Sequence, residues 1–124
     1  MVSDRADEAL NLAGSEGDIV NWDEALERVA GNEDLLKRLL KVVAGTLDSD
    51  LTEMEELLNK NDFDGLAAKV HSLKGSAGNL SIIRVYEQSS QLEKAAKDKD
   101  AEGAGKALEA LKAATQEFLD WLGI

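Results

Sequence analysis

The chain has 124 residues, a formal net charge of −11 at pH 7, and neither cysteine nor proline. This length suits one domain with a single hydrophobic core, and 44% hydrophobic residues are enough to fill it. So acidic a chain is a poor partner for nucleic acid or for an anionic membrane surface, because both carry negative charge themselves. Without cysteine, disulfides, thiolate nucleophiles and thiolate metal sites are excluded.

Composition also predicts the fold class and the cellular location. No apolar run approaches the roughly 20 residues of a membrane span, and the N-terminus lacks the apolar core of a signal peptide. We therefore expect a cytoplasmic protein. Ala, Leu, Glu and Lys dominate the sequence and β-branched runs are short, which favours helix over sheet. The predicted fold class is all-α.

The N-terminal segment differs from the rest of the chain. Residues 1–19 are polar and are expected to form a tail or linker, although a short helix around Ala6–Ala13 is an alternative. The predicted domain covers residues 20–124. It opens with Asn21, which can cap a short helix that starts at Trp22 and ends at Gly31.

Apolar residues then recur at spacings of three and four in four further segments, the pattern of amphipathic helices. The first segment is 33–59. The second segment is expected to be capped by Asp62 and to end at Gly78–Asn79, and Ser81 is expected to cap the third. Residues 97–105 look like a charged, glycine-bearing connection to the last helix. The residues expected to face the core are Leu36, Leu40, Val43, Leu47, Leu51, Met54 and Leu58, then Phe63, Leu66, Val70, Leu73 and Ala77, then Ile82, Val85, Ser89, Leu92 and Ala96, and last Leu108, Leu111, Phe118, Trp121 and Leu122. Four helices, each with one apolar face, predict an up-down-up-down four-helix bundle with a short additional N-terminal helix.

The single histidine, His71, has unusually small neighbours. On a helix, the residues one turn away from it are Ala67, Ala68, Lys74 and Gly75. Glycine costs about 1 kcal/mol relative to alanine inside a helix, so its presence beside a histidine needs a reason. His71 also follows the inward-facing Val70 by about 100°, which places the imidazole at the border between core and solvent. These features indicate that another molecule approaches His71 closely, with Lys74 available to contact an anion there.

The expected hairpin between the second and third helices brings a carboxylate near His71. If the turn centres on residues 80–82, the position opposite His71 is 91 or 92, within one turn of Glu93. Glu93 could then accept a hydrogen bond from one ring nitrogen, fix the tautomer and leave the other nitrogen as a nucleophile. An ordinary solvated glutamate remains the alternative.

The run from His71 to Leu80 resembles the signature of histidine-containing phosphotransfer (HPt) domains, which reads H-x-L-K-G-[AS]-[AS]. Residues 22–36 are similar to the opening segment of this family, and Leu92-Glu93 matches the Leu-Glu of its adjacent helix. Only about the first twenty residues fall outside the resemblance. One departure is Ser81, where the family usually has glycine, and this leaves the geometry of the turn open.

The resemblance implies that His71 takes a phosphoryl group from an aspartate of a receiver domain, or from a kinase, and passes it to an aspartate of a response regulator. By position, Lys74 would neighbour the phosphate and Glu93 would bind the imidazole. The small residues expected to form the docking face for the receiver are Ala67, Ala68, Ser72, Gly75 and Gly78.

The same resemblance implies the partners of the domain. They are receiver domains of response regulators or of a hybrid sensor kinase, in two-component signalling of the bacterial type. Mg²⁺ is expected in the receiver, so the chain itself should need no cofactor or metal. We expect a monomeric phosphocarrier without a kinase active site of its own.

Two other interpretations deserve mention. The face from Ala67 to Gly78 could dock a partner without covalent chemistry, as a helical binding module. The run from Asp98 to Gly103, with Glu109, fits the spacing of an EF-hand calcium loop. However, Gly105 stands where that loop has a hydrophobic residue, and two lysines weaken its negative charge, so we interpret it as a solvated turn. With one histidine and no cysteine, a transition-metal site or a Ser-His-Asp hydrolase is unpromising.

Overall fold

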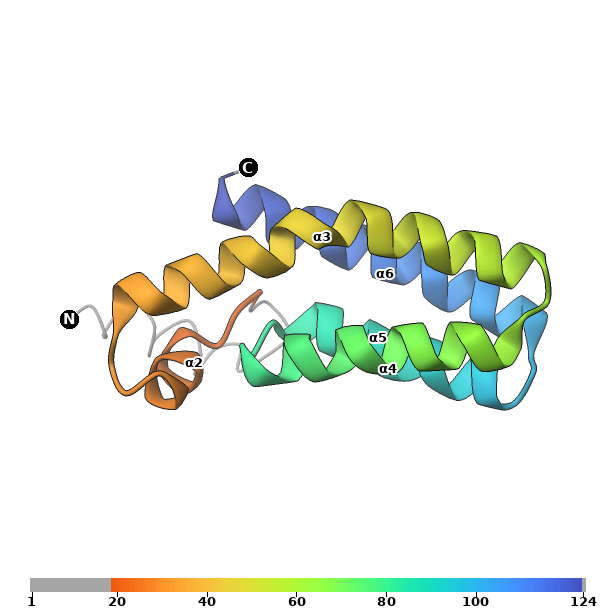
Figure 1. Ribbon diagram of the computed structural model, residues 1–124, viewed down its shortest axis with the longest axis horizontal. Coiled ribbons are helices and arrows are strands. Elements are labelled where there is room, and N and C mark those ends of the chain that lie inside the picture. Colours follow the sequence, from red (N-terminus) through yellow and green to blue (C-terminus); the bar gives the residue numbers. More distant parts are fainter. Residues whose placement is uncertain (1–18, 124) are drawn as a thin grey trace.

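The computed structural model describes residues 19–123, which form five α-helices (Figure 1). They are α2 (Trp22–Arg28), α3 (Glu33–Asn59), α4 (Phe63–Asn79), α5 (Ile83–Lys97) and α6 (Ala101–Leu122). The predicted all-α class and the four long packed helices are confirmed. The predicted tail, and the alternative helix around Ala6–Ala13, lie outside the described residues apart from Ile19. No helix in the described range is long and apolar enough to cross a membrane.

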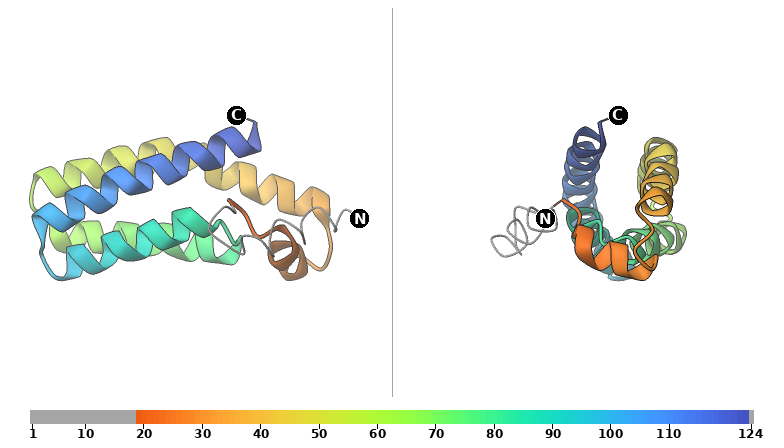
Figure 2. Two further views of the ribbon diagram at one scale, coloured as in Figure 1. Left: turned by 180° about the vertical axis from the view of Figure 1, so that it is seen from behind. Right: turned by 90° about the vertical axis from the view of Figure 1, so that its left-hand side faces the viewer.

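The four long helices pack in a ring, each antiparallel to the next. Helix α4 lies beside α5, α5 beside α6, and α3 packs on both α4 and α6. Helix α3 is the longest and extends beyond the end of α4, where the short helix α2 lies beneath it (Figure 1). Seen along the bundle, α2 crosses the end at which α4 turns into α5 (Figure 2). This arrangement places α2 close to the C-terminal end of α4, the helix that carries His71.

Local capping explains where four of the five helices begin. An Asn or Asp side chain before each of them accepts a hydrogen bond from the backbone N–H three residues later, which satisfies one of the free donors of the first turn. These pairs are Asn21 with Glu24 (3.1 Å), Asn32 with Leu35 (3.0 Å), Asp62 with Gly65 (2.9 Å) and Asp100 with Gly103 (2.9 Å). The predicted caps Asn21 and Asp62 are confirmed.

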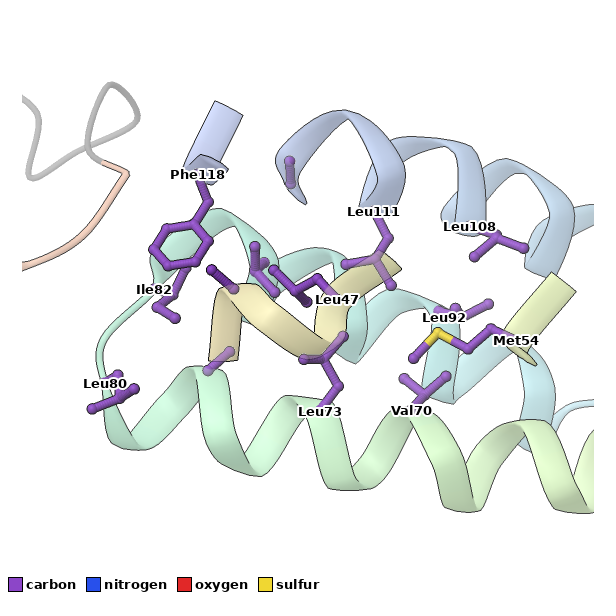
Figure 3. Packing of buried hydrophobic residues seen from close by; sticks show 14 of the residues in the cluster. Leu47, Met54, Val70, Leu73, Leu80, Ile82, Leu92, Leu108, Leu111 and Phe118 are labelled. Carbon is purple, nitrogen blue, oxygen red and sulfur yellow. The ribbon is translucent and has the colours of Figure 1, made fainter. Parts of the chain in front are cut away.

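The core is built mainly from leucine, valine and alanine, as the low aromatic content predicts. Figure 3 shows Met54 of α3, Val70 of α4, Leu92 of α5 and Leu111 of α6 pointing toward one another. All five residues predicted to face inward near α5 are fully or almost fully buried. Some predicted core residues are only half-buried: Val43, Leu51, Leu58, Phe63 and Leu122.

The prediction that Trp121 faces the core is wrong. Its side chain is 43% exposed, because it lies in the last turn of α6, beside α2 rather than between long helices. Its ring packs against Trp22 at 6.4 Å and against Phe118 at 6.3 Å between centroids. Trp121 therefore covers the edge of the core instead of filling it.

The predicted connection over residues 97–105 is also wrong. Helix α5 ends at Lys97 and α6 begins at Ala101, so only three residues join them. Asp100 starts α6 by capping the N–H of Gly103, and the helix continues through Gly103 and Gly105 despite their low helix propensity. The Asp100 carboxylate is engaged as this cap, and α6 already begins at Ala101, inside the run that fits the EF-hand spacing.

Ser81 does not cap α5, contrary to the prediction. The N-cap position is Ile82, which makes no side-chain capping bond, and Ser81 is buried with a left-handed backbone (φ +53°). Its hydroxyl accepts a hydrogen bond from Arg28 and donates one to Glu24, each at 2.6 Å. The serine thus joins α2 to the α4–α5 turn.

The backbone strengthens this junction. The Asn21 N–H donates to the Ser81 carbonyl at 2.9 Å, and the Ile83 N–H donates to the Ile19 carbonyl at 3.0 Å. Arg28 also donates to the carbonyls of Gly78 and Asn79 at the end of α4. The carbonyls at the end of α4 and the first N–H of α5 are therefore satisfied by the segment around α2.

Candidate functional site

His71 projects from the middle of α4 toward solvent. The preceding residue, Val70, is fully buried in the bundle, and Leu73 is almost so. The side chain of His71 is 72% exposed. The predicted border position is confirmed, and the imidazole is accessible to a partner molecule.

The neighbouring helix supplies a buried carboxylate to this imidazole. Glu93 of α5 has a side chain that is only 6% exposed, and its Oε2 lies 2.8 Å from Nδ1 of His71. The hairpin of α4 and α5 thus brings together the two residues that the sequence analysis paired. The alternative of a solvated Glu93 is wrong, because this carboxylate lies between the helices.

Two lysines bind the same carboxylate. Lys74, one turn after His71 on α4, donates to Oε1 of Glu93 at 3.1 Å. Lys97, one turn after Glu93 on α5, lies 3.3 Å from Oε2. One buried anion therefore contacts three basic side chains, His71, Lys74 and Lys97.

These contacts determine the ionisation of Glu93. Burial alone raises the pKa of its carboxyl, but the hydrogen bonds from Lys74, His71 and Lys97 outweigh burial and lower the pKa to about 2. At neutral pH Glu93 is ionised and can only accept hydrogen bonds. In the neutral ring, Nδ1 of His71 therefore carries the proton, and Nε2 keeps its lone pair.

The α3 side of His71 carries a different set of charges. Lys69 forms ion pairs with Asp50 and Glu53 of α3, each at 3.0 Å. The hydrogen bonds that the Lys69 ammonium donates to Glu53 and Asp50 raise the pKa of Lys69. A shallow groove between α3 and α4 is lined here by Val43, Thr46, Asp50, Lys69, Ser72, Leu73 and Ser76. Lys69 is engaged with acids across this groove, whereas Lys74 and Lys97 share the Glu93 carboxylate with the imidazole.

The predicted docking residues fall into two groups. Ala68, Ser72 and Gly75 are exposed around His71, and a Cβ on Gly75 would meet open space. Ala67 is half-buried against the core. Gly78 is half-buried under Tyr86, since a Cβ at Gly78 would lie 3.2 Å from the Tyr86 ring. The open part of the face therefore lies at Ala68, Ser72 and Gly75.

Two residues of the site were missed in the sequence. Lys97 is four residues after Glu93, so helical spacing would have indicated it once Glu93 was placed in the site. Tyr86 had no such signal. Its ring lies 5.9 Å from the Lys74 ammonium, and this contact depends on how α4 and α5 are rotated against each other.

The geometry suits nucleophilic chemistry at one nitrogen. An exposed Nε2 with a lone pair, a fixed tautomer and two nearby ammonium groups can attack an anionic electrophile such as a phosphoryl group. Among residues 19–123, no group of three His, Cys, Asp or Glu side chains is placed to hold a metal ion.

Comparisons with known proteins agree with this chemistry. Residues 38–121 match the model of the Hpt domain family. A rice protein described as a histidine-containing phosphotransfer protein has a similar structure, with a TM-score of 0.76 and 19% identity, covering 97% of this chain and 89% of the rice chain. A histidine-containing phosphotransfer protein from maize gives a TM-score of 0.73 at 20% identity, covering 97% and 91%. Both are plant proteins, so the comparisons do not single out signalling of the bacterial type. The search of curated protein sequences found no significant match.

Proposed function

Because the chain belongs to the Hpt domain family and is a histidine-containing phosphotransfer protein of a phosphorelay, we propose that His71 is the residue that carries the phosphoryl group. The observation that supports this most is the contact between the exposed imidazole and the buried, ionised Glu93. The family consists of phosphocarriers rather than autonomous kinases, and its partners include receiver domains.

The transfer step follows from the protonation of the ring. Nε2 of His71 attacks the phosphorus of a receiver's aspartyl phosphate, and the Nε2–P bond forms as the bond from phosphorus to the aspartate oxygen breaks. The aspartate leaves as a carboxylate. The proton stays on Nδ1, where Glu93 stabilises the positive charge that develops on the ring. The same step in reverse passes the group to a second receiver.

The other residues of the site act on charge and access. Phosphoryl transfer depends mainly on positioning and on neutralisation of charge. Lys74 lies one turn from His71 and would offset part of the phosphoryl group's charge of about −1.5 to −2. Ala68, Ser72 and Gly75 form the low part of the face on which a receiver would dock, with Ala67 and Gly78 at its edges. Mg²⁺ belongs to the receiver's aspartate site.

The finer assignments of partner and location extend this proposal. We propose receivers of response regulators or of a hybrid sensor kinase as the partners. We also propose a monomeric, cytoplasmic protein, since an exposed carrier face must be free to meet one receiver after another. The molar mass of the purified protein, measured by light scattering, tests whether it is a monomer.

The test of the proposed function is direct transfer. Mixing the protein with a ³²P-labelled phosphorylated receiver domain should move the label onto it, as an acid-labile and base-stable adduct. His71→Gln should abolish the adduct, and no other histidine exists in the chain to replace it. A complex with the receiver that forms equally well with both proteins, without any transfer, would instead identify a non-covalent binding module.

A further inference from the structure

Lys97 stands apart from the motif that contains His71 and Lys74. It is the last residue of α5, and its side chain is 65% exposed while that of its partner Glu93 is 6% exposed. A solvent-exposed ion pair at spacing i, i+4 ordinarily contributes little to stability. Here, however, the lysine reaches a buried carboxylate that also binds the reactive histidine.

The two oxygens of Glu93 are occupied in a defined way. Oε1 accepts from Lys74, while Oε2 is shared by Nδ1 of His71 and the ammonium group of Lys97. With donors on both oxygens, the carboxylate cannot rotate without breaking a contact. Its fixed plane in turn fixes the direction of the Nδ1–H bond and the orientation of the imidazole.

The charges of the site do not cancel. With a neutral imidazole, Lys74 and Lys97 bring two positive charges and Glu93 one negative charge. On the α3 side, Lys69 is opposed by both Asp50 and Glu53, so that side adds no positive charge. Without Lys97, the cluster around His71 would be neutral in a chain of net charge −11.

We propose that Lys97 is a positioning residue of the phosphotransfer site: its ammonium group fixes the Glu93 carboxylate and provides the second positive charge for a phosphoryl group on His71. The inference rests on the proposed function of His71. It predicts that a phosphoryl group on Nε2 is bound to a site with one positive charge in excess.

The first experiment uses a chemical phosphoryl donor, so that no receiver is needed. Potassium phosphoramidate should phosphorylate the single histidine: the bond from Nε2 to phosphorus forms, the bond from phosphorus to nitrogen of the donor breaks, and ammonia leaves. The adduct is then titrated by ³¹P NMR at low salt in wild type, Lys97→Gln, Lys97→Arg and Lys94→Gln. Lys94 is the matched control, since it is an exposed lysine of the same helix without an ion pair among the described residues.

A cation beside the adduct favours release of protons from the ring and the phosphoryl group alike. Lys97→Gln should therefore raise the midpoint of the ³¹P titration by about 0.3 pH units and shorten the lifetime of the adduct about twofold. Lys97→Arg and Lys94→Gln should behave as wild type. Equal behaviour of Lys97→Gln and wild type, or an equal shift in Lys94→Gln, would overturn the proposal.

The second experiment examines the contact itself in the unphosphorylated protein. ¹³C NMR of the Glu93 carboxyl should show a titration midpoint near 2, and this midpoint should move upward in Lys97→Gln but not in Lys94→Gln. An unchanged midpoint would show that Lys97 does not bind Glu93 in solution. A failure of the proposed function would give a different result. No label would then pass from a receiver to His71, although the chemical adduct would still respond to substitution of Lys97.

Discussion

At the scale of single residues, Glu93 links stability to pH. Its carboxyl pKa is about 2 in the folded protein, below the 4.5 that is ordinary for a glutamate. A carboxyl whose pKa is lowered by folding stabilises the fold above its unfolded pKa, and this contribution is lost as the pH falls toward the folded pKa. The stabilisation by Glu93 should therefore be complete above about pH 5 and nearly absent at about pH 2.

The variant Glu93→Gln should reveal this contribution. At pH 7 we expect it to unfold more easily than wild type by up to about 3 kcal/mol, because Lys74 and Lys97 lose the buried anion that they contact. The difference should shrink as the pH is lowered to about 2, measured by urea unfolding at each pH. Glu102→Gln, at a side chain that is 82% exposed, is the control. A gap that stays constant with pH would contradict the assignment of Glu93 as the titrating group.

Gly75 offers a second prediction at this scale. A Cβ on Gly75 or on Gly105 of α6 would meet open space, so leucine should fit at both and raise helix stability by up to about 1 kcal/mol. Only Gly75→Leu places a bulky side chain beside His71, and it should weaken receiver binding at least about tenfold. Titration with a receiver, beside thermal unfolding followed by circular dichroism, measures both effects. If the two variants bound the receiver with equal affinity, the docking face would not include the part of α4 around Gly75.

At the scale of elements, the junction between α2 and the α4–α5 turn depends on Ser81. Its left-handed backbone (φ +53°) is unfavourable for serine, and its hydroxyl compensates by bonding Arg28 and Glu24. The glycine that usually occupies this position in the family would relieve the strain but provide no hydroxyl. The serine that departs from the family pattern thus makes contacts with α2 that a glycine could not make.

Two substitutions separate these effects. Ser81→Ala keeps the backbone strain and removes the buried hydrogen bonds, so it should lower the free energy of unfolding by about 1–2 kcal/mol. Ser81→Gly removes the same bonds but relieves the strain, so it should cost about 1 kcal/mol less than alanine. Denaturant unfolding of both variants measures the difference. If alanine were tolerated as well as glycine, the strain at Ser81 would not matter for stability.

At the scale of the whole molecule, the net charge of −11 opposes folding through self-repulsion. The 25 acidic residues outnumber the 14 basic ones, and salt screens their repulsion at distances beyond about 10 Å. Raising NaCl from about 10 mM to about 200 mM should therefore raise the melting temperature by about 2–5 °C. Differential scanning calorimetry checks this. A lower melting temperature in salt would mean that specific ion pairs outweigh the net repulsion.

The sequence by itself determined the helices, their order and the position of His71. Apolar residues at spacings of three and four are a local property, and the caps Asn21 and Asp62 act within a single turn, so both could be predicted without a structure. The motif around His71 is equally local, because Lys74 and Gly75 lie one helical turn away. The exposure of Trp121 and the short α5–α6 connection were less predictable, since packing of the bundle's end and one capping bond decide them.

Only the tertiary structure decided how side chains of different helices meet. The hydrophobic stripes of α4 and α5 fix their register to within about one turn, which was enough to bring Glu93 into consideration but not to show that it is buried. The convergence of Lys74 and Lys97 on that carboxylate, and the bonds of Ser81 to α2, depend on the relative rotation of elements far apart in sequence. Contacts of this kind are set by packing of the whole core, and local sequence patterns do not contain them.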